Sequence, residues 1–388
     1  MKKILIVNNN MKVGGVQKSL YNLLWEIHGR YAVTLLLFQP VGAYLDHLPP
    51  DVRVISSRGP MSQLGLSQGE CHGADTLKRG ALAALCKTVG RPTTLKLMLA
   101  GEKALEEEYD CAISFLHEGG RKSFYGGVQA FVLHKVRAKK KIAFLHCDYR
   151  SCGANFRENN RDMEKFDRIA ACSDGCAAAF CQSLPRLTGK CVTVRNFHRF
   201  DEIRALAAQG PAAYDPCRRN VVMVARLAHE KGLERALRAT AHALSRDIPV
   251  TLHLVGGGPM EGKLRALAAE LGIGAQVRFH GEQTNPYRFM AGAELFLLTS
   301  FHEAAPMVIE EARCLGLPTL TVQTTSSHEM VTREGCGWVC ANNQQALNEA
   351  LCRVLEDRTG LEALGERLKT RVNDNTRAAA QFAALIEE

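Results

Sequence analysis

The most constraining feature of this sequence is an alternation of short apolar runs with helical stretches, which occurs once in each half of the chain. Apolar runs of about four to eight residues between turn residues are typical of strands buried on both faces of a parallel sheet. The predicted strands are 3–7, 32–38, 111–116, 141–146, 220–225, 250–256, 277–281, 294–300 and 318–322. The predicted helices are 17–27, 232–244, 260–271 and 307–315. This order predicts an α/β fold with doubly wound parallel sheets.

The chain has 388 residues, more than one hydrophobic core usually supports, so we expect two domains. A segment rich in glycine and proline, 210–220, precedes the first strand of the second half. We therefore place domains at 1–195 and 196–370, followed by a terminal helix at 371–388.

The amino-terminal sequence MKKILIVNNN has an apolar run too short for a signal peptide, and no apolar stretch approaches the length of a membrane span. Fourteen cysteines without a CxxC pair indicate small core residues in a reducing compartment, with a zinc site as a minor alternative. We expect a cytoplasmic protein.

Positive charge is concentrated in the first half of the chain. Residues 1–195 contain 28 Lys and Arg against 17 Asp and Glu, whereas the rest contains 21 against 23. A basic half indicates an anionic partner: nucleic acid, an anionic membrane surface or a phosphate-bearing substrate. The segment 76–100 has five cations and no acid, which fits basic helices at a membrane interface, although an ordinary surface helix pair is favoured. No nucleic-acid-binding signature is found, so nucleic acid is not expected.

Open parallel sheets bind ligands at the carboxyl ends of their strands, so the loops there are candidate sites. After the first strand, Gly14 and Gly15 precede a helix and can bring backbone amides to a phosphate, although such a pair is more often a simple turn. In the second half, Arg226 and Lys231 can converge on a diphosphate, or they can be solvated loop residues. Three glycines at 256–258 allow a close backbone approach.

The loop before the predicted helix 307–315 carries most of the chemistry. Glu303 lies before the helix and can accept hydrogen bonds from sugar hydroxyls, while Pro306 fits the first helical position. The amides of Met307 and Val308 offer a positive helix end to phosphate, and Glu311 follows on the second turn. The alternative is that Glu303 caps the helix and that Glu310 and Glu311 are surface acids.

Taken together, these loops resemble a known family. The stretches VARLAHEKG, LHLVGGGPMEGKLRALAAELGI, VRFHGEQTNPYRFMAGAELFLLTS and HEAAPMVIEEARCLGLP strongly resemble the nucleotide-sugar-binding domain of glycosyltransferase family 4, especially its capsule, lipopolysaccharide and teichoic-acid branch. In the first half, VGGVQKSLYNLL, YDCAISFLHEGG and KKKIAFLHCDY resemble the family's first loop and later strands. The resemblance covers nearly the whole chain.

The resemblance implies a GT-B fold, with two Rossmann-like domains facing across a cleft: an acceptor-binding domain, a nucleotide-sugar-binding domain, and a last helix that returns to the first. It implies transfer of a sugar from a nucleoside diphosphate donor, with a UDP-sugar as the expected donor, to a glycan or lipid-linked glycan in cell-surface polysaccharide synthesis. The anomeric configuration would be retained, and neither metal nor cofactor would be needed. The sequence has no DxD motif. The alternatives are a non-catalytic nucleotide-sugar-binding subunit and a GT-B UDP-sugar epimerase.

By position, the resemblance assigns the donor diphosphate to Arg226 and Lys231, the sugar hydroxyls to Glu303 and the ribose to Glu311. Gly14 and Gly15 would line the phosphate and acceptor side. His146 matches the family's cleft histidine near the donor sugar, although on residue type alone it is more often a core histidine at a strand end. The sequence departs from the family at Ala304 and Ala305, where glycine and often an aromatic residue are usual, and at Thr324–Ser327, where glycines are common.

Overall fold

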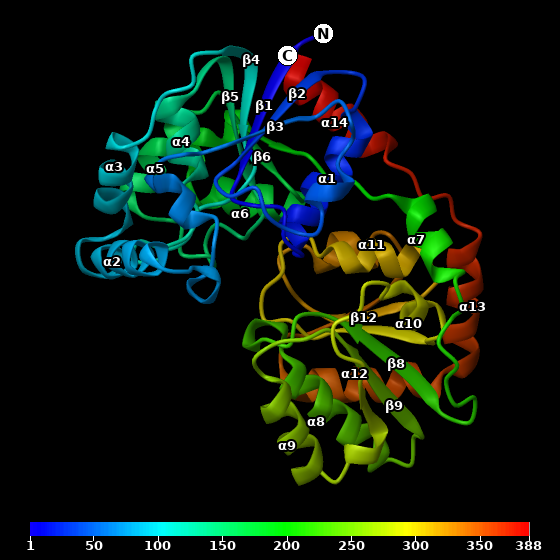
Figure 1. Cartoon of the computed structure of the whole chain (residues 1–388). Helices are drawn as coiled ribbons and strands as arrows, with labels where there is room; N and C mark the ends of the chain where they lie inside the picture. Colours follow the sequence, from blue (N-terminus) through cyan, green and yellow to red (C-terminus); the bar gives the residue numbers. More distant parts are fainter. Residues whose placement is uncertain (388) are drawn as a thin grey trace. The chain divides into compact units, whose positions relative to one another are not determined.

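The computed structural model describes residues 1–387 and divides into two compact units. The first unit combines Met1–Phe197 with the segment from Asn375 onward, and the second is His198–Asp374. Each unit has its own parallel sheet with helices on both faces (Figure 1).

The first unit contains a seven-stranded parallel sheet in the order β3-β2-β1-β4-β5-β6-β7. Its strands are β1 (Lys3–Asn8), β2 (Ala32–Leu37), β3 (Arg53–Ser56), β4 (Glu108–Ser114), β5 (Arg137–Leu145), β6 (Arg168–Ala171) and β7 (Cys191–Thr193). Leu5 and Val7 belong to the core on one face of the sheet, and Ile4 and Ile6 to the core on the other, because alternate side chains of a strand point to opposite faces. The four strands predicted in this half are confirmed. The three unpredicted strands, β3, β6 and β7, are short, and β3 and β7 lie at the sheet edges.

The first unit's α-helices are α1 (Gly15–Ile27), α2 (Ala74–Val89), α3 (Arg91–Ala100), α4 (Val128–Lys135), α5 (Arg157–Glu164), α6 (Asp174–Ser183) and α14 (Thr376–Glu387). Although α14 comes last in the chain, its Ala378, Phe382 and Leu385 pack into the same core as Ile4 and Ile6. The carboxyl end of α14 is also attached to β5, since Lys140 in that strand donates a 2.7 Å hydrogen bond from Nζ to the carbonyl of Leu385.

The second unit contains a six-stranded parallel sheet in the order β10-β9-β8-β11-β12-β13. Its strands are β8 (Arg219–Val224), β9 (Val250–Val255), β10 (Val277–Phe279), β11 (Leu295–Leu298), β12 (Thr319–Val322) and β13 (Gly337–Cys340). Its α-helices are α7 (Phe200–Ala207), α8 (Leu233–Leu244), α9 (Glu261–Glu270), α10 (Tyr287–Ala291), α11 (Met307–Cys314), α12 (Gln344–Glu356) and α13 (Arg358–Lys369). All five strands and three helices predicted in this half are confirmed.

Both sheets reverse their strand order at a defined point, between β1 and β4 in the first unit and between β8 and β11 in the second. This is the topology of doubly wound Rossmann-like domains, which bind ligands at the carboxyl ends of the strands beside the reversal. The predicted fold class of two such domains is therefore confirmed, and the candidate sites lie in the loops after these four strands.

Two predictions for the first half need refinement. The segment 76–100 does form helices, α2 and α3, but Arg91 is buried and forms an ion pair with buried Glu118, so not all five cations belong to the surface. All fourteen cysteines are free thiols, and nine of them are buried, which supports their interpretation as core residues. No helix among residues 1–387 is long and apolar enough to span a bilayer.

Candidate functional site

At the reversal in the second sheet, Lys231 and Glu303 form an ion pair. Lys231 lies in the loop after β8 and Glu303 in the loop after β11, and Nζ donates a 2.8 Å hydrogen bond to Oε1. The lysine side chain is 28% exposed and the glutamate side chain 11% exposed. The structure therefore brings together a cation and an acid that lie 72 positions apart in the sequence.

The backbone around this pair is tightly connected. Gly232 adopts a left-handed conformation (φ 62°), and a Cβ there would lie 2.2 Å from the carbonyl oxygen of Thr299 at the end of β11. The Thr299 hydroxyl donates a 2.9 Å hydrogen bond to the Gly232 carbonyl, and the Phe301 amide donates one of 3.0 Å to the carbonyl of Glu230. Only glycine combines this backbone conformation with so close an approach. The loop after β8 is thus fixed to the end of β11.

The glycine loop at 256–258 packs against the same loop. Gly256 has a φ of 139°, and a Cβ there would lie 2.0 Å from the Ala225 carbonyl oxygen. The Leu227 amide donates a 2.8 Å hydrogen bond to the Gly257 carbonyl. Gly256 and Gly258 therefore permit close backbone packing of the loop that carries Arg226 and Lys231, and the approach of this glycine loop to a ligand stays a prediction.

Arg226 is largely exposed and forms an ion pair with Glu230, four positions along the chain. Arg226 lies in the same loop as Lys231, but its ion-pair partner is Glu230. Sequence reasoning missed Glu230, although the spacing of four between an arginine and an acid was the signal that could have found it. Each of the two predicted diphosphate-binding cations thus forms an ion pair with a carboxylate.

The amino end of α11 differs from the prediction by one position. Pro306 has ψ 119° and is the N-cap, so the helix begins at Met307 instead of at the proline. The amides of Met307 and Val308 are therefore in the first turn, where backbone donors have no intrahelical acceptor. Ala304 and Ala305 do not have positive φ, so this loop is built without the left-handed backbone that glycine would allow.

Glu311 and its neighbour Glu310 have different surroundings. Glu311 is 1% exposed, so the alternative that it is a surface acid is wrong. Glu310 forms an ion pair with Arg313, which also binds Glu334 at 2.9 Å. Because Glu311 is enclosed, a ribose can contact it only after its side chain or the loop before α11 moves.

In the first unit, Gly14 is the N-cap of α1 and Gly15 its first residue. A Cβ on Gly15 would meet no atom within 4 Å, so the start of α1 is sterically open. Asn10 fixes the preceding loop, because its side-chain Oδ1 accepts a hydrogen bond from the Lys12 amide and its Nδ2 donates to the Gly65 carbonyl. The two glycines are thus near the switch point, as their position after β1 requires.

His146 follows β5 and lies against the rings of Phe115 and Phe144, with centroid distances of 4.6 and 5.7 Å. Burial lowers the pKa of His146 to about 3, so its ring is neutral at physiological pH. A second histidine, His117, follows the adjacent strand β4, and burial lowers its pKa to about 4. Sequence reasoning missed His117, although LHEGG at a strand end was a signal for it.

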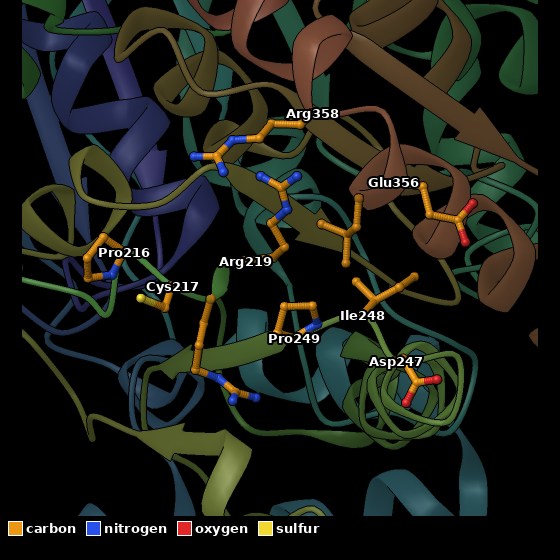
Figure 2. Close-up of a pocket in the computed structure, with 10 residues that line it drawn as sticks. Pro216, Cys217, Arg219, Asp247, Ile248, Pro249, Glu356 and Arg358 are labelled. Carbon is orange, nitrogen blue, oxygen red and sulfur yellow. The ribbon is translucent and has the colours of Figure 1, made fainter.

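The second unit also has a cavity of about 290 Å³ at the amino ends of β8 and β9, on the sheet edge opposite the predicted site (Figure 2). Arg219, Asp247, Glu356 and Arg358 are among its lining residues. Its arginines already have partners, since Arg219 binds Glu294 at 3.1 Å and Arg358 binds Glu362 at 2.7 Å. Because it lies at the amino ends of these strands, the cavity is separate from the loops that carry the predicted chemistry.

Residues 215–371, within the second unit, match the family described as "Glycosyl transferases group 1". Among curated relatives, the chain is 34% identical over 127 residues to the lipopolysaccharide glucosyltransferase WaaG of Escherichia coli (strain K12), covering 32% of this chain and 34% of WaaG. It is 32% identical over 160 residues to the lipopolysaccharide core biosynthesis glycosyltransferase LpsD of Rhizobium meliloti (strain 1021), covering 40% of this chain and 45% of LpsD. These matches span between a third and a half of the relatives.

Solved structures match over the whole chain. HepE of Anabaena, solved in complex with UDP and glucose, has a TM-score of 0.69 at 19% identity, covering 100% of both chains. The crystal structure of WaaG has a TM-score of 0.63 at 16% identity, covering 97% of this chain and 99% of WaaG. The likeness confirms the predicted GT-B fold class.

Proposed function

We propose that this protein is a glycosyltransferase that transfers a sugar from a UDP-sugar to a glycan or lipid-linked glycan in cell-surface polysaccharide synthesis. The observation that carries the proposal is the 2.8 Å Lys231–Glu303 pair at the switch point of the second sheet, within the segment that matches the transferase family. Support for the donor comes from HepE, which was solved with UDP and glucose. Support for the acceptor class comes from a Campylobacter jejuni relative whose name specifies a diphospho-undecaprenol acceptor, 27% identical over 210 residues.

In the proposed mechanism, Lys231 and Arg226 leave their carboxylates to bind the donor diphosphate, together with the first amides of α11. Cations and a helix amino end stabilise the negative charge that accumulates on the departing diphosphate. Glu303, released from Lys231, accepts hydrogen bonds from the donor sugar, and Glu311 binds the ribose after the movement described above.

The acceptor hydroxyl forms its bond to the anomeric carbon on the face from which the diphosphate leaves, so the configuration is retained. The hydroxyl proton passes to an oxygen of the departing diphosphate, which makes a protein base unnecessary. A group with a pKa of about 3 is a poor proton acceptor at neutral pH, so His146 does not act as a base. Its neutral ring contributes a hydrogen bond near the donor sugar instead.

The test is a panel of nucleotide sugars scored for thermal stabilisation of the protein and for slow hydrolysis of the donor. We expect UDP and one UDP-sugar to raise the melting temperature and that UDP-sugar to be hydrolysed. A chelator should leave the hydrolysis rate unchanged. If no nucleotide sugar stabilises the protein, the proposal is wrong.

The Glu303→Ala variant tests the assigned role of the acid. We expect it to keep UDP binding and to lose about 10²- to 10³-fold in turnover, the usual effect of removing a group that acts in the transition state. The matched control is Glu282→Ala, which removes an acid from the loop after β10. Unchanged turnover in Glu303→Ala would contradict the assignment, and binding without any turnover in the wild type would favour a non-catalytic subunit.

A further inference from the structure

Two cysteine sulfur atoms are in contact in the loop between β5 and α5. The Sγ atoms of Cys147 and Cys152 are 3.0 Å apart. A disulfide bond is about 2.0 Å long, so the two sulfur atoms need to approach each other by only about 1 Å to form one. Cys147 is buried, whereas Cys152 is only partly buried. A small reagent can therefore reach Cys152, and the sulfur of Cys147 lies directly beside it.

A tight turn keeps the two sulfur atoms together. The amide of Cys152 donates a 3.0 Å hydrogen bond to the carbonyl of Asp148. The amide of Arg150 donates one of 2.9 Å to the side chain of Asp148. Tyr149, within this turn, is 1% exposed, and its hydroxyl donates a 2.7 Å hydrogen bond to the side chain of Asn160. The turn is thus fixed at both its backbone and its buried ring, so the two cysteines are preorganised to react with each other.

The hydrogen bond between the two thiols gives them different acidities. The S–H of Cys147 donates to Sγ of Cys152, and this bond lowers the pKa of Cys152 despite the opposite effect of partial burial. The same hydrogen bond, together with burial, raises the pKa of Cys147. Because the thiolate is the nucleophilic form of a cysteine, Cys152 is suited to attack an oxidant. Cys147 is then the resolving thiol, which completes the disulfide.

We propose that Cys147 and Cys152 are a reversible dithiol–disulfide pair that is oxidised by a small-molecule disulfide such as glutathione disulfide. The Cys152 thiolate attacks one sulfur of the reagent, which forms a mixed disulfide and releases one glutathione. The Cys147 sulfur then attacks the Cys152 sulfur, which closes the disulfide within the chain and releases the second glutathione. Each released glutathione takes up the proton that one protein thiol has lost. The protein is oxidised by two electrons, and the reagent is reduced by the same two.

Neither thiol takes part in the proposed sugar transfer, so the modification goes beyond that function. Cys147 directly follows His146, which the proposed mechanism places near the donor sugar. Oxidation therefore cross-links the loop that begins at this histidine. In a reducing compartment, such as the cysteine content predicts, a disulfide of this kind is usually transient and serves redox sensing.

The test is incubation of the full-length protein with glutathione disulfide, followed by alkylation of the remaining thiols, trypsin digestion without reductant and mass spectrometry. Cleavage after Arg150 separates the two cysteines into the peptides 142–150 and 151–157, each of which has a single cysteine. We expect these peptides to be joined by a disulfide and to separate on treatment with dithiothreitol. Exposed Cys217, in the second unit, is the internal control and should carry only a glutathione adduct.

Two variants separate the roles of the thiols. In Cys147→Ala, glutathione should remain attached to Cys152, because the resolving thiol is absent. In Cys152→Ala, Cys147 should acquire no glutathione, because its sulfur is buried and its pKa is raised. Thermal denaturation of the reduced variants checks that both fold, and the peptide map of the wild type tests the pair without either variant.

Another pair of thiols in the same unit provides a comparison. Cys181 and Cys191, in α6 and β7, also share a hydrogen bond, and burial raises the pKa of Cys191. We expect this pair to be oxidised about tenfold or more slowly than Cys147 and Cys152, since the rate follows the thiolate fraction. Wild-type peptides 142–150 and 151–157 that stay separate, a disulfide found only between Cys181 and Cys191, or folded Cys147→Ala without glutathione on Cys152 would each overturn the proposal. None of these readouts requires turnover, so they do not depend on the transferase assay.

Discussion

At the residue scale, His253 shows how the second unit keeps a polar group in its core. His253 lies in β9, where Nε2 is 3.1 Å from Asn220 Oδ1 and Nδ1 is 3.1 Å from His280 Nε2. Its ring stacks on Tyr214 at 3.8 Å. If Nε2 donates to the Asn220 oxygen, Nδ1 must accept from His280, so His253 keeps both hydrogen bonds only when its own ring is neutral. Burial and the neighbouring His280 lower the pKa of His253 to about 4.

This environment predicts a loss of stability in acid. Between the ordinary pKa of 6.5 and the folded value of about 4, the unfolded chain binds a proton that the folded chain does not. His253 therefore makes its full contribution to the free energy of unfolding above pH 6.5. This contribution decreases as the pH falls, by at most about 3 kcal/mol at 1.36 kcal/mol per pKa unit.

We expect urea denaturation of His253→Gln to give a shallower fall in the free energy of unfolding between pH 6.5 and 4 than the wild type gives. His72→Gln, at an exposed position, should keep the wild-type slope. An identical slope in His253→Gln would contradict the assignment.

At the element scale, the loop after β8 is positioned by its contact with the end of β11. Gly232 permits the contact because its left-handed backbone approaches the Thr299 carbonyl. The same loop carries both Arg226 and Lys231, so the position of these cations depends on the backbone conformation of Gly232. Helix α8 then begins at Leu233, directly after this glycine.

The Gly232→Ala variant should therefore be destabilised by more than about 1 kcal/mol, because alanine has to adopt a strained backbone and its Cβ collides with a carbonyl. Gly262→Ala is the matched control: Gly262 lies in α9 with nothing within 4 Å of an added Cβ, and alanine there should be neutral or stabilising by up to about 1 kcal/mol. Thermal denaturation measures both. Equal melting temperatures for the two variants would refute the role given to Gly232.

At the scale of the whole molecule, the excess of positive charge belongs to the first half of the chain. Helices α2 and α3 contribute exposed apolar side chains there, Leu77 at 77% and Leu97 at 59% exposure. Lys78, Lys87 and Lys96 are exposed on the same two helices. Exposed leucines next to lysines motivate a test of peripheral binding to an anionic membrane.

We expect the protein to bind anionic vesicles at low salt and to be released as salt rises above about 0.1 M, where charges farther apart than about 10 Å are screened. Replacing Lys78, Lys87 and Lys96 by glutamine should weaken binding by about 1 kcal/mol per lysine, whereas Lys263→Gln in the second unit should have no effect. Vesicle sedimentation measures the bound fraction. Equal binding to neutral and anionic vesicles would count against a membrane surface on α2 and α3.

The fold class and most elements of the second unit could be predicted from the sequence, because buried parallel strands appear as continuous apolar runs and helices show a period of 3.6 residues. Edge and half-buried strands such as β3 and β13 escaped prediction, since their residues are not uniformly apolar. The loops that follow β1, β8 and β11 could be predicted as candidate sites, because their glycines, cations and acids stand next to recognisable strand ends in the sequence.

Only the tertiary structure decided which of these residues meet. The pairing of Lys231 with Glu303 and the burial of Arg91 against Glu118 both join segments far apart in the chain. A linear pattern specifies residue types and periods, whereas burial and partners depend on how the strands are ordered in the sheet.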